Sequence, residues 1–132
     1  MTETKMFAVQ PAVLSTVRDF VRSHARDQSF SDVAEDIALA VTEACANAIL
    51  HSQSAEMRVS VSAGPDAMEI EIQDQGLFRA RIGVPELDGE AHRGFQLMTA
   101  MMDEVAVIEG TPGRPGTLVR LVKRKRSADA IR

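Results

Sequence analysis

Two segments in the middle of the chain alternate between apolar and polar residues, and a turn signal separates them. Their apolar residues are Met57, Val59, Val61, Met68, Ile70 and Ile72. Alternation with a period of two is typical of strands that have one buried face and one wet face. Because Gly64, Pro65 and Asp66 favour a tight turn, the pattern predicts an antiparallel β-hairpin.

Two segments before the hairpin repeat their apolar residues at every third or fourth position. This spacing predicts helices that each bury one stripe, over residues 11–26 and 32–51. Ser29 or Ser31 is expected to cap the second helix, with Asp32 as the capping-box partner of Ser29. Further patterns predict an edge strand at residues 6–9, a short helix at about 95–102, and strands at 105–108 and 117–123.

The order of these elements is strand, helix, helix, hairpin, helix, hairpin. It predicts an α+β fold, a two-layer α/β sandwich in which three helices cover one face of a mainly antiparallel mixed sheet of about five strands. We find no internal repeat, so residues 1–132 are expected to form a single domain with its core at about 7–124. Since the chain has no Trp and no Tyr, Phe and aliphatic side chains must fill that core.

Composition limits the class of protein. A single cysteine cannot form an internal disulfide, which fits a reducing compartment. The chain shows neither a signal-peptide pattern nor an apolar stretch of about 18 residues, so a cytoplasmic protein is expected. The formal net charge of -4 argues against broad nucleic-acid binding.

Two segments lack clear periodicity. Residues 75–93 contain Gly76, Gly83 and Pro85 and are interpreted as a long loop, with a lid over a binding site at about 77–93. The basic run that begins at Lys123 opens a C-terminal tail, residues 123–132. Such a run is typical of a solvated strand end, although an acidic partner would also suit it.

Glu43, Asn47 and His51 follow one another at four-residue steps, which places them on one face of the second helix. A carboxylate, an amide and an imidazole aligned in this way suit a phosphate site. An amide oxygen is a good ligand for Mg²⁺, and a carboxylate can orient or deprotonate a hydroxyl group. The alternative is an exposed polar helix face with no further role.

Three more short motifs carry candidate binding residues. Asp74 ends a strand, where it can accept a hydrogen bond from an exocyclic amine, and Gly76 would let the backbone approach a flat ring. Arg93 and Gly94 open the predicted third helix, whose free N–H groups would suit phosphate. Thr117 begins the last strand and can join a base-binding network with Asp74. Each motif alone also fits an ordinary strand end, helix start or strand residue.

The cysteine and two of the histidines are expected to have no role in catalysis or metal binding. Cys45 lies between Ala44 and Ala46 and is interpreted as a small core residue rather than a nucleophile. His24 and His92 have no metal-ligand spacing with the cysteine, so no zinc site is expected.

Taken in order, four segments resemble the motifs of the GHKL, or Bergerat-fold, histidine-kinase-like ATPases. They are residues 43–51 for the N-box, 74–76 for the first glycine box, 93–105 for the second glycine box and the strand after it, and 116–119 for the final strand. Within this superfamily, the chain resembles the anti-sigma-factor serine kinases of the RsbW type.

The resemblance implies an ATP and Mg²⁺ site in which Glu43 is the catalytic base and Asn47 holds the metal ion. The other implied nucleotide-binding residues are His51, Asp74, Gly76, Arg93, Gly94 and Thr117. The implied reaction transfers the γ-phosphoryl group of ATP to a serine of a STAS-domain anti-sigma-factor antagonist. The resemblance also implies a sequestered sigma factor, a role in stress-responsive transcription, and a homodimer.

Two positions depart from the resembled motifs. Leu77 and Phe78 follow Gly76 where a second glycine is usual, and His92 stands where the second glycine box usually has another. A Cβ at these positions would crowd a nucleotide or stiffen the lid. The alternative function is therefore a regulatory module that binds a sigma factor or antagonist but holds nucleotide weakly or not at all.

Overall fold

The predicted hairpin is present at the centre of the sheet. The computed structural model describes residues 2–51, 55–74, 89–111 and 114–125. In it, β2 (Glu56–Ala63) and β3 (Ala67–Asp74) pair antiparallel, with Met57 opposite Asp74. The turn closes where the N–H of Gly64 donates to the carbonyl of Ala67 over 2.9 Å.

Three more strands extend this hairpin into a five-stranded sheet of order β1-β2-β3-β5-β4. They are β1 (Thr2–Ala8), β4 (Glu104–Thr111) and β5 (Arg114–Arg124). All four pairings of the described strands are antiparallel, so the expected mainly antiparallel sheet has no parallel pair in the described part of the chain. Each of these three strands is longer than its apolar pattern predicted.

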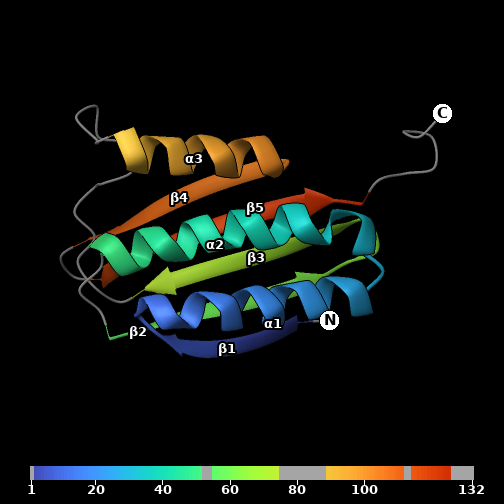
Figure 1. The fold of residues 1–132 in the computed structure, drawn as a ribbon, viewed down its shortest axis with the longest axis horizontal. Coiled ribbons are helices and arrows are strands. Elements are labelled where there is room, and N and C mark those ends of the chain that lie inside the picture. Colours follow the sequence, from blue (N-terminus) through green and yellow to red (C-terminus); the bar gives the residue numbers. More distant parts are fainter. Residues whose placement is uncertain (1, 52–54, 75–88, 112–113, 126–132) are drawn as a thin grey trace.

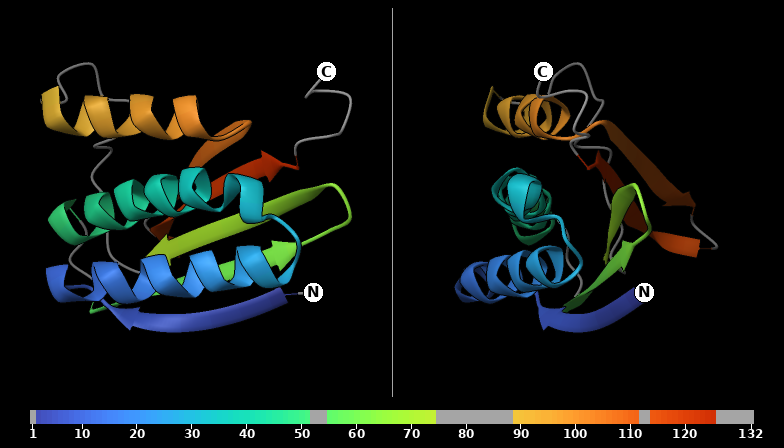
Figure 2. Two further views of the ribbon diagram at one scale, coloured as in Figure 1. Left: turned by 45° about the vertical axis from the view of Figure 1, so that its right-hand side comes forward. Right: turned by 90° about the vertical axis from the view of Figure 1, so that its right-hand side faces the viewer.

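Helices α1 (Leu14–Asp27), α2 (Ala34–His51) and α3 (Gly89–Met101) lie across the same face of the sheet (Figures 1 and 2). Short 3-10 turns, η1 (Pro11–Val13) and η2 (Ser31–Val33), precede the first two. Helix α2 lies between α1 and α3 and packs against both. The predicted α+β, two-layer fold is confirmed. No helix in the described ranges is long and apolar enough to cross a membrane.

The connection between α1 and α2 corrects the capping prediction. Ser29 has a positive φ of 71° and ends α1 instead of starting α2. Its N–H donates to the carbonyl of Arg26 over 3.3 Å, and the N–H of Phe30 donates to that of Ala25 over 2.7 Å. These two bonds form a Schellman motif. The cap position of η2 is Phe30, which makes no side-chain cap hydrogen bond, so the expected capping box is wrong.

Helix α3 corrects a second boundary. It was predicted to open at Arg93 and Gly94, but it begins at Gly89. The last part of the predicted lid at 77–93 is therefore helical, and residues 75–88 lie outside the described part of the chain. Gly94 consequently lies inside a helix, not at its start.

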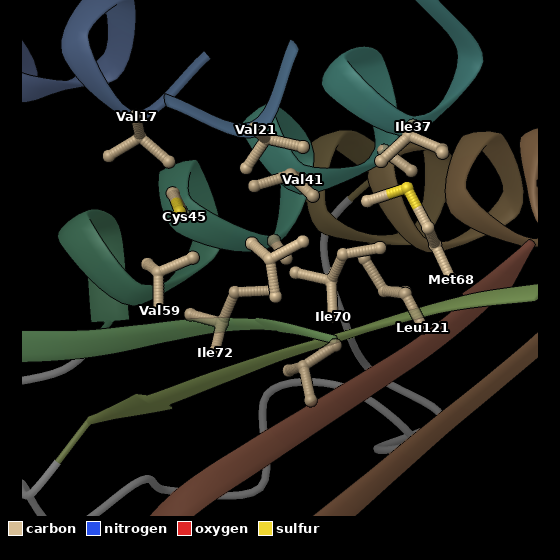
Figure 3. Close-up of a cluster of buried hydrophobic side chains, with 14 of the residues drawn as sticks. Val17, Val21, Ile37, Val41, Cys45, Val59, Met68, Ile70, Ile72 and Leu121 are labelled. Carbon is tan, nitrogen blue, oxygen red and sulfur yellow. The ribbon is translucent and has the colours of Figure 1, made fainter. Parts of the chain in front are cut away.

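The core lies between the two layers and consists of aliphatic, Met and Phe side chains, as predicted. Figure 3 shows side chains from the helices meeting those from the sheet. The labelled ones are Val17, Val21, Ile37, Val41, Cys45, Val59, Met68, Ile70, Ile72 and Leu121. Phe7 and Phe30 add two buried rings. Since each large apolar side chain contributes about 1.5–3 kcal/mol when fully buried, this layer stabilises the helices on the sheet.

The basic run at the end of β5 is not a freely solvated strand end. The Nζ atom of Lys123 donates to the carbonyl of Met101 over 2.7 Å and lies 3.5 Å from Oδ2 of Asp36. Arg124 pairs with Glu104 at 2.9 Å. The first residues of the predicted basic tail therefore belong to the fold, and residues 126–132 lie outside the described part of the chain.

Candidate functional site

The polar stripe of α2 turns inward. Asn47 is only 5% exposed, and Glu43, one helical turn before it, is half-buried. The interpretation of this stripe as an exposed polar face is therefore wrong for these two residues. His51 is the last residue of α2, and its side chain lies outside the described part of the structure.

Helix α3 brings a third predicted residue to this stripe. A Cβ atom built on Gly94 would lie 3.1 Å from Oε2 of Glu43 and 3.9 Å from Nδ2 of Asn47. Gly94 is itself buried. The contact shows that the two helices approach closely at the point where the candidate carboxylate and amide lie.

The sheet contributes two buried polar residues. Asp74 ends β3 and is 3% exposed, and Thr117, near the start of β5, is 2% exposed. The register pairs Gln73 with Leu118, so Asp74 and Thr117 are the next positions on these neighbouring strands. Directly opposed side chains on one sheet face have Cβ atoms about 4.5–5.5 Å apart. The predicted neighbourhood of Asp74 and Thr117 is thus present.

These elements converge at one end of the molecule. Figure 1 shows the C-terminal end of α2, the end of β3, the start of β5 and the start of α3 on the left-hand side. Helix α2 also contacts β3 and β5 directly. Segments far apart in the sequence therefore bring the two helix residues and the two strand residues to the same end of the fold.

Two of these residues bury polar atoms without a partner. Within the described part of the chain, neither Nδ2 of Asn47 nor Oγ1 of Thr117 has a hydrogen-bond partner. Leaving a buried donor or acceptor unpaired costs about 1–3 kcal/mol. Folded proteins pair most such groups, so exceptions call for an explanation such as a ligand that binds there. Both atoms belong to residues that the sequence predicted to bind nucleotide.

Two further buried side-chain atoms in the described part of the chain lack a hydrogen-bond partner, but each belongs to a side chain that contacts a glutamate. Nε of Arg22 lies 2.8 Å from Oε2 of Glu35, within ion-pair distance. The unpaired Nε2 belongs to His24, whose Nδ1 lies 3.3 Å from Oε1 of Glu3. These two residues lie where α1 meets α2 and β1, away from the candidate site.

The prediction that Gly94 starts the third helix is wrong, and its role in phosphate binding stays a prediction. The N–H groups that a helix leaves free are those of its first turn, and α3 begins at Gly89. The N–H of Gly94 is therefore placed for hydrogen bonding within the helix. Gly76 and Leu77 lie outside the described residues, as do the side chains of His92 and Arg93, although both of the latter belong to α3.

Cys45 adjoins the site in sequence but does not take part in it. Its side chain is fully buried in the core, and burial raises the pKa of the thiol to about 12. Since the thiolate is the nucleophilic form, this cysteine is inert at neutral pH. Among the described residues, no group of three or more His, Cys, Asp or Glu side chains is arranged to hold a metal ion.

The contact between Gly94 and Glu43 was not predicted from the sequence. The available signal was a glycine in a segment with helical periodicity, where glycine is unfavourable unless a neighbour comes very close. That signal was obscured because α3 was expected to begin at this glycine.

Comparison with known proteins identifies the family of the chain. Residues 7–123 match the histidine kinase-like ATPase domain, and the chain belongs to that family. Among solved structures, it is similar to the Acinetobacter baumannii histidine kinase AdeS, with a TM-score of 0.54 and 10% sequence identity. The match covers 95% of this chain and 68% of that one, and at this identity it shows the fold alone. The comparison with curated proteins gives no significant match.

The predicted superfamily is thereby confirmed. Membership in the histidine kinase-like ATPase family indicates ATP binding and a kinase, ATPase or regulatory role. The narrower assignment to the anti-sigma-factor serine kinases belongs to the proposal below.

Proposed function

We propose that this protein is a Mg-ATP-dependent serine kinase that also acts as an anti-sigma factor. It would phosphorylate a serine of a STAS-domain anti-sigma-factor antagonist and hold a sigma factor inactive by sequestration. The observation that carries the proposal is the pair on α2, in which the half-buried Glu43 precedes the buried Asn47, whose Nδ2 has no partner among the described residues.

The residues at this end of the molecule fit a magnesium nucleotide. The amide of Asn47 offers an oxygen suited to Mg²⁺, which needs few protein ligands when phosphates supply the others. Its unpaired Nδ2 can donate to a phosphate oxygen. Thr117 and Asp74 supply a hydroxyl and a carboxylate that suit the polar edge of adenine.

Bound Mg-ATP would supply the phosphoryl group that is transferred. Glu43, half-buried on the helix face next to Asn47, would orient the substrate serine and accept the proton of its hydroxyl. The fold would contribute mainly position and charge stabilisation, on which phosphoryl transfer depends.

The partners follow from the resemblance of residues 43–51 to the N-box of the anti-sigma-factor kinases. On this proposal, the chain works as a cytoplasmic homodimer and exchanges a sigma factor for its antagonist. Phosphorylation of the antagonist would return the kinase to the sigma factor. The proposal includes a single ATPase domain spanning residues 1–132.

A second candidate is a regulatory module that retains the fold but binds nucleotide weakly. The observation that favours it is the position of Gly94 inside α3, where its N–H is not free for phosphate. Leu77 and His92, which depart from the resembled glycine boxes, point the same way. The kinase and the regulatory module would have the same fold, so measurements of nucleotide binding and of phosphoryl transfer are needed to distinguish them.

The test of the kinase proposal is incubation with labelled ATP, Mg²⁺ and candidate STAS-domain proteins from the same genome. We expect label on a serine of one of them. Removal of a general base typically costs about 10²- to 10⁴-fold in rate. Glu43→Ala should therefore lower transfer by that order while Mg-ATP binding persists.

A matched control is Glu35→Ala, because Glu35 is a glutamate near the other end of the same helix, with a side chain that is 65% exposed and pairs with Arg22 and Arg26 rather than with a site residue. It should transfer phosphate at close to the unmodified rate. Equal labelling by Glu43→Ala and the unmodified protein would refute the role of Glu43, and label on no serine would refute the kinase assignment.

A further inference from the structure

Gly94 occupies a place where helix formation alone would favour another residue. It lies inside α3, and glycine is less favourable than alanine in a helix interior because it loses more backbone freedom. It is also buried, so a larger apolar side chain would ordinarily add packing. Some neighbour must therefore exclude a side chain at this position.

That neighbour is the carboxylate of Glu43. A Cβ atom on Gly94 would come within 3.1 Å of Oε2 of Glu43, whereas the nearest atoms of Asn47 would be at 3.9 and 4.0 Å, in ordinary contact. The crowded atom is the far end of a flexible side chain. A methyl group at Gly94 would therefore move the carboxylate by a few tenths of an ångström and leave the helix backbones in place.

We infer that Gly94 is a positioning residue for Glu43. The missing Cβ leaves the space that the carboxylate occupies, so the packing of α3 against α2 determines where the base of the proposed reaction lies (Figure 2). This inference rests on the proposed kinase function for its catalytic consequence, but the packing contact itself does not depend on it. It differs from a role in which the Gly94 backbone approaches a phosphate group.

The contact can be tested without nucleotide by a cycle of Gly94→Ala, Glu43→Ala and the double variant in thermal unfolding. In the Glu43→Ala background nothing crowds the new methyl group, so Gly94→Ala should raise Tm by about 3 °C through helix propensity. In the unmodified background, crowding should cancel most of that rise. Equal Tm shifts in both backgrounds would overturn the inference.

Gly64→Ala is the matched control. A Cβ on Gly64 would meet only the carbonyl oxygen of Ala67, at 3.6 Å, and this turn does not contain a site residue. Its effect on Tm should be the same with and without Glu43. If the Tm shift caused by Gly64→Ala differed between the two backgrounds, Glu43→Ala would alter stability throughout the fold. The coupling seen at Gly94 would then not reflect a direct contact, which would count against the inference.

The catalytic consequence is tested by phosphoryl transfer. A misplacement of about 1 Å can cost about 100-fold in rate, so Gly94→Ala should lower transfer about 10-fold or more while the Kd for Mg-ATP changes less than about threefold. Combined with Glu43→Ala, it should cause no further loss. A loss that persists in the Glu43→Ala background, or a large rise in Kd in both backgrounds, would assign Gly94 to phosphate binding instead and overturn the inference.

Failure of the proposed function gives a different result. If the unmodified protein transfers no phosphate while the Tm shifts remain coupled, the kinase proposal and the catalytic consequence fall, and the contact between Gly94 and Glu43 stands. If transfer occurs but the Tm shifts are uncoupled, the kinase proposal stands and the positioning role of Gly94 is refuted.

Discussion

Thr117 has a buried hydroxyl group that lowers stability and that the proposed site would use to bind nucleotide. Its hydroxyl oxygen is buried and has no hydrogen-bond partner among the residues that the structure describes. A residue selected only for stability at this place would be apolar, because a valine of the same shape avoids the cost of desolvating a hydroxyl group. The proposed site gives that hydroxyl a partner when nucleotide is bound.

Thr117→Val should therefore separate stability from affinity. We expect thermal unfolding without nucleotide to show an unchanged or higher Tm, since the buried hydroxyl is unpaired. The affinity for ATP should fall by about 3- to 10-fold, the equivalent of one lost hydrogen bond. An affinity equal to that of the unmodified protein would show that this hydroxyl does not contact the nucleotide.

At the residue scale, the sequence was most informative where the geometry is local. Glu43 and Asn47 share a face because they are four residues apart in one helix, and this spacing needs no tertiary information. The closeness of Gly94 to Glu43 depends on how near two helices approach, which no spacing encodes. Ser29 was assigned to the wrong helix because its polar side chain suits an N-cap, whereas its backbone adopts the left-handed conformation that ends α1.

At the scale of elements, Lys123 joins three segments that are distant in sequence. From β5 it donates to the carbonyl of Met101 at the end of α3, and it lies 3.5 Å from Asp36 in the first turn of α2. A cation near the C-terminus of a helix interacts favourably with the helix dipole. Because this side chain is 15% exposed, solvent screens the interaction only in part.

Lys123→Met keeps the apolar stem but removes the charge and the donor. We expect it to lower the free energy of unfolding by about 1.5–3 kcal/mol, the range for a hydrogen bond that involves a charged group. Denaturant titration measures the loss. Hydrogen exchange should also show faster opening at the end of α3.

Arg124→Met is the control for that change. Arg124 pairs with Glu104, but their side chains are 59% and 50% exposed, so the pair contributes little. Its replacement should cost less than about 0.5 kcal/mol. A loss at Arg124 equal to that at Lys123 would mean that the joining role of Lys123 is wrong.

The periodicity of apolar residues predicted which segments are helices and which are strands, but it did not predict the residues at which they begin and end. The hairpin of β2 and β3 followed from strict alternation around a turn, and the stripes of α1 and α2 followed from helical spacing. The start of α3 was placed too late because its first turn contains no apolar stripe. The extra length of β1 comes from pairing with β2, which lets polar residues join the sheet.

At the scale of the whole molecule, the fold separates a stabilising layer from the end that carries the candidate site. The core between helices and sheet is apolar, and three of the four buried polar residues in the described part of the chain, Asn47, Asp74 and Thr117, belong to the end where α2, β3 and β5 converge, whereas His24 lies on α1. Motif order predicted that these residues share a site, and the contacts of α2 with β3 and β5 bring their elements to this end. The contribution of Gly76 and of the predicted lid lies outside the described residues.

Calorimetric titration of the unmodified protein and of Asn47→Ala with ATP and Mg²⁺ tests the central claim most directly. We predict saturable binding to the unmodified protein that weakens when Mg²⁺ is chelated. Asn47→Ala should bind at least about 10-fold more weakly, since it loses both the oxygen and the donor of the amide. Absence of binding to the unmodified protein, or equal affinity in both proteins, would contradict the assignment of this helix face to a magnesium nucleotide.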